Sequence, residues 1–386
     1  MAHPQIDVQR ITKWLTEEAF PLWMTTGFDQ QNGCFVESLS RHSIPETTHR
    51  RAIVQMRQVY SLCEGHRLQR LSKAHILPLV EKTMDYVIKH YARPSGAFIH
   101  AVDLNGKASN LQEDLYTQAF VLFGLAHAFE LTGKDEYKQR AYQLITFLNT
   151  SRRHQLLGYT EIINGQISFQ SNPHMHLFES ALAWMRTDSN PVWKNLAIEL
   201  FELCKTKFID HQTQILAEHF DENWAPVLHN GQFVFEPGHQ FEWAWLLLEF
   251  QKLSGMSLNH LALKLFQNGQ NYGINKNTNF VYDEVWSDFR PKKLSSRLWP
   301  HCEWIKAALA IAPLIDDPNE RKHCVHQAEL GVSTLFKYFH DLKPGLWEDL
   351  HTEEGSFSPQ SVKASSFYHI VNALSEYIQK RPQFDF

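Results

Sequence analysis

Residues 115–148 read LYTQAFVLFGLAHAFELTGKDEYKQRAYQLITFL, and their pattern predicts the repeating unit of the fold. Apolar residues recur at three- and four-residue spacing from Leu115 to Phe129, which is typical of a helix with a buried face. Gly133 closes this segment, and a second helical pattern follows from Tyr137 to Leu148. The stretch therefore predicts two helices joined by a short turn.

The same unit recurs along the chain. Each period opens with a turn-like element, in which Gly or Asn usually precedes an aromatic or apolar residue and often an acid. The six elements are Gly33-Cys34-Phe35-Val36-Glu37, Gly96-Ala97-Phe98, Gly158-Tyr159-Thr160-Glu161, Leu216-Ala217-Glu218, Asn279-Phe280-Val281-Tyr282-Asp283 and Gly345-Leu346-Trp347-Glu348. With 33, 96, 158, 217, 280 and 345 as reference positions, the steps are 63, 62, 59, 63 and 65 residues. Six helical pairs thus fill the chain.

The apolar periodicity predicts twelve helices, two in each period. They span residues 6–25, 48–66, 74–92, 111–131, 135–150, 174–188, 192–208, 238–254, 256–269, 298–313, 319–338 and 365–380. Alternating β-branched runs are scarce and lie at the turn-like elements, where short hairpins are expected. Six near-equal periods without polar capping repeats favour a closed ring over an open α-solenoid, which is the alternative. We expect an all-α fold, an (α/α)6 barrel with short β-hairpin or loop elements at one end. No linker composition divides the chain, so residues 1–386 are expected to form a single catalytic domain.

Composition restricts the classes of function. The formal net charge of −5 and the pI near 6.5, with acidic and basic residues interleaved, give no electrostatic basis for binding nucleic acid or a membrane. A small, neutral or weakly charged molecule is the expected partner. Five scattered cysteines without a C-x-x-C pair indicate reduced thiols, and the first residues lack the apolar core of a signal peptide. We therefore expect a cytoplasmic protein, either a monomer or a homodimer.

In every period, the helix after the turn-like element opens with polar and aromatic residues. These openings are Gln55–Gln58, Asp114–Tyr116, Asn172–Glu179, Pro237–Trp243, Arg297–Trp304 and Ser366–His369. If alternate helices line the barrel in one direction, all six openings meet at one mouth. Free backbone N–H groups and positive dipole ends at helix starts suit sugar oxygens and developing negative charge. A pocket is therefore predicted at that mouth.

Several of these openings resemble the N-acylglucosamine 2-epimerase family. The resemblance is carried by PGHQFEW at residues 237–243, by RLWP at 297–300 followed by Glu303-Trp304, by Asn172-x-x-x-His176 with Glu179, and by Tyr368-His369. These motifs occur in the family's order and span nearly the whole chain. The resemblance implies an (α/α)6 barrel that interconverts sugars without a metal or other cofactor.

Moving a carbonyl between C1 and C2 of a sugar requires ring opening, removal of the C2 proton to give an enediol(ate), and reprotonation. The reaction needs a base that titrates near neutrality and a fixed donor for the oxygen that gains charge. Histidine meets the first need and arginine the second. The resemblance implies that His239 and His369 are the catalytic acid/base pair, that Arg57 stabilises the enediolate, and that His176 binds the sugar ring.

Other residues are expected in or beside the substrate site. Glu242, one helical turn from His239, is expected to orient that imidazole or to assist ring opening. Trp299 and Trp304 offer apolar faces to a sugar ring. The resemblance adds Asp114, Tyr116, Asn172, Glu179 and Glu303; for Glu179, Glu303 and Arg297, a mutually paired Arg–Glu network is the alternative.

The motifs are closest in style to the mannose isomerase branch, so mannose–fructose interconversion through a cis-enediol(ate) is the expected reaction. A 2-epimerase acting on mannose, an N-acylglucosamine or a disaccharide is the near alternative. Remoter alternatives are a glycoside hydrolase that uses Glu179, Glu242 or Glu303, and a sugar-binding protein without turnover. His174-x-His176 with Glu179 superficially resembles a metal-binding set. Because there is no His-Glu-x-x-His motif and no compact Cys/His set, no metal is expected.

Overall fold

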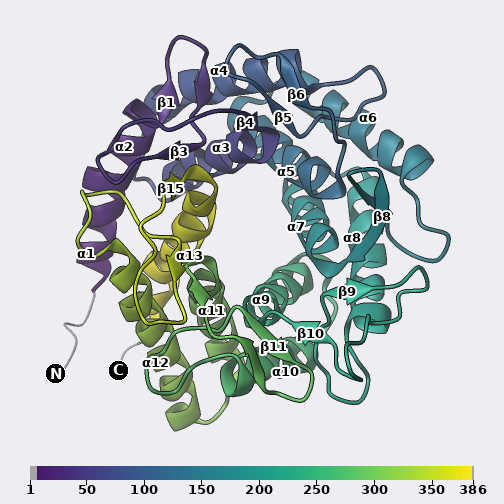
Figure 1. Ribbon diagram of the computed structural model, residues 1–386, viewed down its shortest axis with the longest axis vertical. Coiled ribbons are helices and arrows are strands. Elements are labelled where there is room, and N and C mark those ends of the chain that lie inside the picture. The colour runs from purple at the N-terminus through teal and green to yellow at the C-terminus, as the bar shows by residue number, and fades with distance from the viewer. Residues whose placement is uncertain (1–6, 385–386) are drawn as a thin grey trace.

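A computed structural model describes residues 7–384, so residues 1–6 and 385–386, including the first residue of the predicted helix 6–25, lie outside the described part. Two concentric rings of helices surround one axis (Figure 1). The inner ring consists of α3 (Ala52–Arg67), α5 (Leu115–Thr132), α7 (Ser171–Thr187), α9 (Pro237–Ser254), α11 (Trp299–Ile311) and α13 (Phe367–Lys380). The outer ring consists of α1 (Val8–Lys13) continued through a π-helical segment into α2 (Phe20–Thr25), α4 (Lys73–Tyr91), α6 (Asp135–Ser151), α8 (Pro191–Leu203), α10 (Asn259–Tyr272) and α12 (Pro318–Leu335).

The inner ring is closed. Each inner helix packs against the next, and the last one, α13, packs against the first, α3. An open solenoid would leave these two helices apart at opposite ends of the array. The predicted (α/α)6 barrel is therefore confirmed, and the solenoid alternative is wrong.

Short strands gather at one mouth of the barrel (Figure 1). They are β1 (Phe28–Asp29), β2 (Cys34–Phe35), β3 (Ser38–Leu39), β4 (Arg50–Arg51), β5 (Ala101–Val102), β6 (Ala108–Asn110), β7 (Glu161–Ile163), β8 (Gln166–Gln170), β9 (His219–Phe220), β10 (Val234–Phe235), β11 (Glu284–Trp286), β12 (Pro291–Lys293), β13 (Ser296–Arg297), β14 (Leu350–His351) and β15 (Val362–Lys363). They form small antiparallel sheets, several of which join neighbouring repeats: β4 pairs with β5, and β8 with β9. The pairing of β3 with β15 joins the first repeat to the last.

Glutamines at the start of three inner helices hold the turn-like elements in place. The Gln55 carboxamide accepts a hydrogen bond from the Phe35 N–H at 2.8 Å and donates one to the Phe35 carbonyl at 3.0 Å. Gln118 and Gln240 bond in the same way to Phe98 and Leu216. Each bond satisfies backbone groups that would otherwise be buried without a partner.

His174 and His301 take the place of this glutamine in two other repeats. The Nε2 atom of His174 accepts from the Tyr159 N–H at 3.0 Å, and that of His301 accepts from the Val281 N–H at 3.1 Å. Burial lowers the pKa of both histidines to about 4, so both rings are neutral and can accept these bonds. These two histidines therefore hold the turn-like elements of their repeats, as the glutamines do in three others.

The predicted helices agree with the observed ones except at a few ends. The helix expected from residue 48 begins at Ala52, because Arg50 and Arg51 pair with β5 as a strand. The helix expected over 192–208 changes to a π-helical form after Leu203. All five cysteines are buried and unpaired. Of the described helices, none is long and apolar enough to cross a membrane.

Candidate active site

A cavity of about 170 Å³ lies where the inner helices begin, at the mouth that carries the strands. Its lining consists of Arg57, Tyr116, Asn172, His176, Glu236, His239, Glu242, Arg297, Trp299, Ser365, Ser366 and His369. These side chains come from all six repeats, as the convergence of the helix starts predicted. The cavity brings together both expected catalytic histidines, but its lining does not include Asp114, Glu179 or Glu303.

His239, near the start of α9, is held by a carboxylate that has no basic partner in the described structure. Its Nδ1–H donates to Glu218 Oε2 at 2.8 Å. The same carboxylate accepts from the Ser171 hydroxyl at 2.8 Å and from the Glu236 N–H at 3.0 Å. Burial would lower the pKa of His239, but the negative charges of Glu218 and Glu236 raise it to about 9. His239 is therefore protonated at neutral pH and presents an N–H donor to the cavity.

His369, near the start of α13, has the same kind of hydrogen bond but the opposite electrostatics. Its Nδ1–H donates to Glu303 Oε1 at 2.8 Å. The other oxygen of that carboxylate forms an ion pair with Lys306 Nζ at 2.6 Å, and both side chains are fully buried. Burial, together with the positive charges of Arg57 and Lys306, lowers the pKa of His369 well below its ordinary value. His369 is therefore neutral, and its Nε2 lone pair is left as a hydrogen-bond acceptor.

Burial would also lower the pKa of Lys306. Three carboxylates around it, on Glu303, Glu242 and Glu179, instead raise that pKa above its ordinary value. Lys306 thus carries a buried positive charge, which neutralises Glu303, the partner of His369. No comparable cation neutralises Glu218 among the described residues, which explains why the two histidines titrate in opposite directions.

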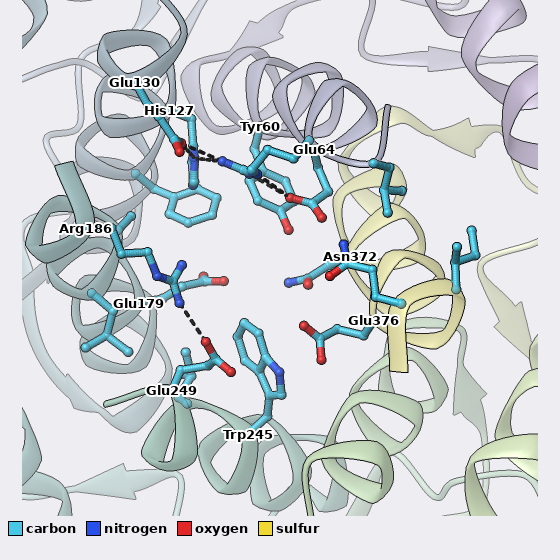
Figure 2. Close-up of a pocket in the computed structure, with 18 of the residues that line it drawn as sticks. Tyr60, Glu64, His127, Glu130, Glu179, Arg186, Trp245, Glu249, Asn372 and Glu376 are labelled. Carbon is cyan, nitrogen blue, oxygen red and sulfur yellow. Dashed lines mark hydrogen bonds and ion pairs between the residues drawn. The ribbon is translucent and has the colours of Figure 1, made fainter. Parts of the chain in front are cut away.

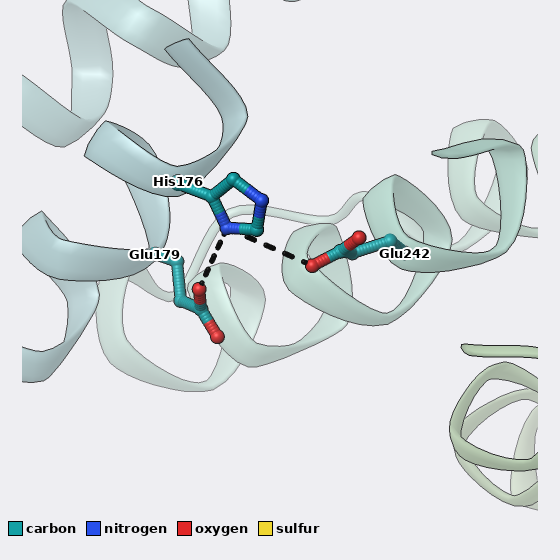
Figure 3. A group of neighbouring side chains, drawn as sticks. All are labelled: His176, Glu179 and Glu242. Carbon is teal, nitrogen blue, oxygen red and sulfur yellow. Dashed lines mark hydrogen bonds and ion pairs between the residues drawn. The ribbon is translucent and has the colours of Figure 1, made fainter. Parts of the chain in front are cut away.

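His176, Glu179 and Glu242 form a third buried group on α7 and α9 (Figure 3). His176 Nδ1 lies 3.1 Å from Glu179 Oε2 and 3.9 Å from Glu242 Oε1. Burial lowers the pKa of His176 to about 4, so the neutral ring donates its Nδ1–H to Glu179. Burial and the nearby charge of Glu303 raise the pKa of Glu242 well above its ordinary value, which favours the protonated form of this carboxyl.

The same three side chains are close enough together to offer three ligand atoms to a metal ion. His176 Nδ1 already donates to Glu179, and the raised pKa of Glu242 favours its protonated form. Both features disfavour metal binding, because metal ligands must give a free lone pair. The hydrogen-bonded arrangement fits a sugar hydroxyl better, since Glu242 can donate and the remaining nitrogen of His176 can accept.

Arg57 lies between the cavity and the aromatic wall of the barrel. Its guanidinium donates to the Tyr116 hydroxyl at 2.7 Å and to the Ser365 carbonyl at 3.1 Å, and its charge lies 4.1 Å from the centre of the Phe120 ring. These contacts fix the position of the guanidinium while leaving other N–H groups to bind a substrate oxygen. Asn172, whose buried Oδ1 has no partner in the structure, also lines the cavity.

Trp299, at the start of α11, forms an apolar wall shared by both catalytic candidates. Its ring centre lies 5.0 Å from that of His239 and 5.6 Å from that of His369. A Cβ atom at Gly238 would come within 2.5 Å of this indole, so the absence of a side chain there allows the ring to lie against α9. Trp299 is thus placed to pack on the face of a sugar ring.

Three sequence predictions are corrected in their details. Glu218, 21 residues before His239, orients that imidazole instead of Glu242. Trp304 is fully buried between helices, beside Phe241, and does not line the cavity. Asp114 caps α5 by accepting from the Thr117 N–H at 2.8 Å, and its other oxygen contacts His100. Both oxygens of Asp114 are thus hydrogen-bonded within the protein, and Asp114 does not line the cavity.

The alternative, a mutually paired network of Arg297, Glu179 and Glu303, is wrong. Arg297 pairs with Glu236 at 2.6 Å and with Asp283 at 2.8 Å, whereas Glu303 pairs with Lys306. Glu218, Glu236 and Lys306 were not identified from the sequence as site residues. The acid that recurs in the turn-like elements was a usable signal for Glu218, but a buried lysine leaves no pattern in one sequence.

Comparisons with known proteins place the chain among sugar-converting enzymes. The sequence profile of the N-acylglucosamine 2-epimerase (GlcNAc 2-epimerase) family matches residues 33–373. A protein of Rhizobium meliloti (strain 1021) named mannose-6-phosphate isomerase is 34% identical over 368 residues, 94% of either chain. The solved structure of a D-mannose isomerase matches with a TM-score of 0.86 at 18% identity, over 98% of this chain and 100% of the other. Cellobiose 2-epimerase from Bacillus thermoamylovorans B4167 matches with a TM-score of 0.85 at 17% identity, over 96% and 98%. At such identities, the structural matches establish the fold alone.

Proposed function

The chain belongs to the N-acylglucosamine 2-epimerase family, and on this premise we propose that it is a sugar isomerase that interconverts D-mannose and D-fructose by histidine acid/base catalysis. The observation that carries the proposal is the different pairing of two histidines in one cavity: His239 bonds to Glu218, which has no lysine or arginine partner among the described residues, and His369 bonds to Glu303, which Lys306 neutralises. Because His239 has a pKa of about 9 and that of His369 is well below its ordinary value, one is an acid and the other a base at neutral pH.

His239 serves ring opening in this mechanism. Its protonated imidazole donates a proton to the ring oxygen of the pyranose, the bond between C1 and the ring oxygen breaks, and the C1 hydroxyl gives its proton to water, which yields the open-chain aldehyde. The imidazole then regains a proton from water. Glu218 holds the imidazole through Nδ1 and stabilises its charged form.

His369 carries the proton between carbons. Its free Nε2 removes the C2 proton, and the electrons of the C–H bond form the C1–C2 double bond of the enediolate. The positive charge of Arg57 stabilises the oxygen that gains charge at C1. The same imidazole then returns the proton to C1, while O2 becomes the carbonyl oxygen of fructose and its proton passes to O1. Because Arg57 and His239 supply the positive charge, this scheme requires no metal.

The unequal histidines favour isomerisation over 2-epimerisation. A reversible 2-epimerase needs a base on each face of the enediol, because the forward and reverse reactions begin on opposite faces. His239 holds its proton up to a pH of about 9 and is therefore a poor base at neutrality. One neutral base on one face, His369, suffices for an aldose–ketose isomerase.

The cavity favours a free monosaccharide. Its volume of about 170 Å³ is below the range of about 300–1,000 Å³ that is typical for larger ligands, so a disaccharide would have to extend out of the mouth. Arg57 and Arg297 are the only lysine or arginine side chains among the lining residues of the described structure. Arg57 is hydrogen-bonded to protein groups, and Arg297 is paired with two carboxylates. Arg57 is thus the cation of the described lining that has no carboxylate partner, and in the proposed scheme it binds the enediolate oxygen. No second free cation of this lining remains for a phosphate group.

Hydrolysis is disfavoured by the same geometry. Of Glu179, Glu242 and Glu303, only Glu242 lines the cavity, whereas a glycosidase places two carboxyl groups on either side of the scissile bond. The other glutamate of the lining, Glu236, is paired with Arg297 at 2.6 Å. Glu303 is committed to Lys306 and His369.

Product analysis tests the proposed reaction. The enzyme is incubated separately with D-mannose, D-mannose 6-phosphate, cellobiose and an N-acylglucosamine, and the products are followed by NMR. We expect fructose as the first product from mannose and slower or no conversion of the others. Glucose as the first product from mannose would replace the isomerase by an epimerase, and preferential conversion of mannose 6-phosphate would replace the free sugar as substrate. Activity that a chelator removes and a divalent metal restores would contradict the metal-free scheme.

A further inference from the structure

A second and larger cavity, here called the distal cavity, opens at the opposite mouth of the barrel, where the inner helices end (Figure 2). Its volume is about 720 Å³, compared with about 170 Å³ for the cavity that holds the catalytic histidines. It is lined by side chains of α3, α5, α7, α9 and α13, and the proposed isomerisation uses no group that is found only there.

The floor of the distal cavity is a layer of the barrel interior. One residue from each of four inner helices contributes to this layer. Each lies five positions after the residue that holds the turn-like element, and all four line the distal cavity: Tyr60, Phe123, Glu179 and Trp245. Asn372 on α13 joins them. The equivalent position on α11 is occupied by Lys306, whose Nζ lies 4.1 Å from the centre of the Trp245 ring. This layer separates the distal cavity from the catalytic one.

The floor contains polar groups without partners. Asn372 is only 4% exposed, its Nδ2 has no hydrogen-bond partner, and its carboxamide points toward the middle of the cavity in Figure 2. The indole N–H of Trp245 likewise has no acceptor. Natural proteins rarely leave buried donors unpaired, and when they do, a bound molecule is a common reason.

His127 adds a third donor at the wall. Burial lowers its pKa to about 4, so its ring is neutral. Its Nδ1 accepts from Arg67 Nη1 at 3.1 Å, which leaves the hydrogen on Nε2, and this nitrogen has no partner.

The net negative charge around the distal cavity disfavours an anionic occupant. Arg67 is paired with Glu64 at 2.7 Å and Glu130 at 2.6 Å, and Arg186 is paired with Glu249 at 2.8 Å. The lining contains five glutamates and three arginines in total, a formal balance of −2 with His127 neutral. Buried donors, carboxylate acceptors and the aromatic rings of Tyr60, Phe123 and Trp245 together match a neutral molecule with many hydroxyl groups.

Glu179 connects the distal cavity to the catalytic one. One of its oxygens accepts from the Tyr368 hydroxyl, the other accepts from His176 at 3.1 Å, and its side chain also lines the distal cavity. A molecule that hydrogen-bonds to Glu179 from the distal side would therefore weaken its hold on His176, which lines the substrate cavity.

We propose that the distal cavity is a second binding site, which takes a neutral polyhydroxylated molecule of the sugar class and influences catalysis through Glu179. The binding step stands apart from the proposed isomerase activity, whereas its effect on turnover rests on that activity.

Equilibrium dialysis with radiolabelled D-mannitol tests the binding step, because mannitol lacks the carbonyl group and is not turned over. The wild-type chain is expected to bind two equivalents. Asn372→Leu, which removes the unpaired amide at nearly constant volume, should bind one equivalent, and so should Arg57→Met, which alters the catalytic cavity. Ser375→Ala is the matched control: it removes a buried, unpartnered polar atom from the same helix but lines neither cavity, and should still bind two.

A second variant keeps the test decisive. If Asn372→Leu fails to fold, as judged by circular dichroism, Trp245→Phe removes the indole donor and should also reduce binding to one equivalent. Wild-type binding of one equivalent or none, or two equivalents that persist in Asn372→Leu or Trp245→Phe, would overturn the proposal. With mannose as substrate, mannitol should lower kcat and raise KM in the wild type but only raise KM in Asn372→Leu. An inactive wild type that still binds two equivalents would refute the isomerase proposal and leave the second site standing.

Discussion

His239 and His369 bind a carboxylate through the same nitrogen, yet they titrate in opposite directions. The difference lies in the partners of the two carboxylates, because Lys306 neutralises Glu303 whereas Glu218 keeps its charge. Both histidines and Arg57 could be predicted from the sequence, since they lie in motifs at helix starts. Their partners could not be predicted in the same way. Glu218 comes from a turn 21 residues before His239, and one sequence contains no sign of which acid a lysine will neutralise.

Replacement of Glu218 tests the protonated state of His239. In the wild type, kcat/KM should fall as pH rises through about 9, where His239 loses its proton. Glu218→Gln removes the main charge that raises this pKa, so the alkaline limb should move to lower pH. A charged hydrogen bond is worth about 1.5–3 kcal/mol, so kcat/KM at neutral pH should also fall by about tenfold to a hundredfold.

The control for this pH profile is Glu202→Gln, a half-buried change on α8 that lines neither cavity. It should leave the wild-type profile unchanged. An alkaline limb that stays near pH 9 in Glu218→Gln would show that another group sets it.

Replacement of Lys306 tests the buried ion pair. Lys306→Met leaves Glu303 buried without its cation, and breaking such a pair costs about 3–5 kcal/mol. The free energy of unfolding, measured by urea titration, should fall by that amount. Lys194→Met, an exposed change on α8, should alter it by no more than about 0.5 kcal/mol. Equal stabilities for the two variants would mean that the pair contributes nothing to the fold.

At the scale of the element, the starts of inner helices both hold turn-like elements and contribute side chains to the cavity. One polar residue, Gln55 or its counterparts, bonds backward to the turn-like element, and residues just after it face the axis. The helices themselves could be predicted because their apolar periodicity is strong. The strands could not be predicted individually: most contain two or three residues, too few to show alternation, and their pairing joins different repeats.

Gly238 provides a test at the start of α9. A methyl group there would come within 2.5 Å of Trp299, while helix propensity itself favours alanine. Gly238→Ala should therefore keep the fold but displace the indole, raising KM for mannose by about tenfold, the effect of about 1.4 kcal/mol. In the double variant with Trp299→Phe, which removes the clashing atoms, Gly238→Ala should add little further loss.

That double-mutant cycle has a clear opposite outcome. If the effects of Gly238→Ala and Trp299→Phe on KM are simply additive, the two residues do not act through their contact.

At the scale of the whole molecule, closure of the ring brings residues of all six repeats together around one cavity at one mouth of the barrel. The sixfold period predicted the barrel, and the pairing of β3 with β15 and the packing of α13 on α3 show how it closes. The distal cavity could not be predicted, since its lining comes from helix ends that show no motif. The cavity exists only because five helices converge there.

Buried histidines make the whole fold sensitive to acid. The pKa values of His127, His174, His176 and His301 are lowered to about 4, so the folded state binds fewer protons than the unfolded state below pH 6.5. The contribution of these four histidines to the free energy of unfolding should therefore be constant above about pH 7 and fall as pH decreases from 6.5 towards 4, by up to about 1.4 kcal/mol per pH unit for each histidine.

His174→Gln is the matched variant for this effect. It introduces the residue that holds the same turn in three other repeats, so the backbone bond can be kept without a titrating ring. Urea unfolding at pH 7 and pH 5 should show a smaller loss on acidification than in the wild type. If the free energy of unfolding falls by the same amount between pH 7 and pH 5 in both proteins, His174 does not contribute to the acid sensitivity.

The measurement that tests the mechanism most directly is deuterium incorporation from D2O during turnover of mannose, followed by NMR for the wild type and for His369→Asn. The wild type should place deuterium at C1 of fructose and at C2 of recovered mannose. His369→Asn, with its fold verified by circular dichroism, should incorporate no deuterium at either carbon. Incorporation at the wild-type rate in His369→Asn would contradict the assignment of His369 as the base that moves the proton.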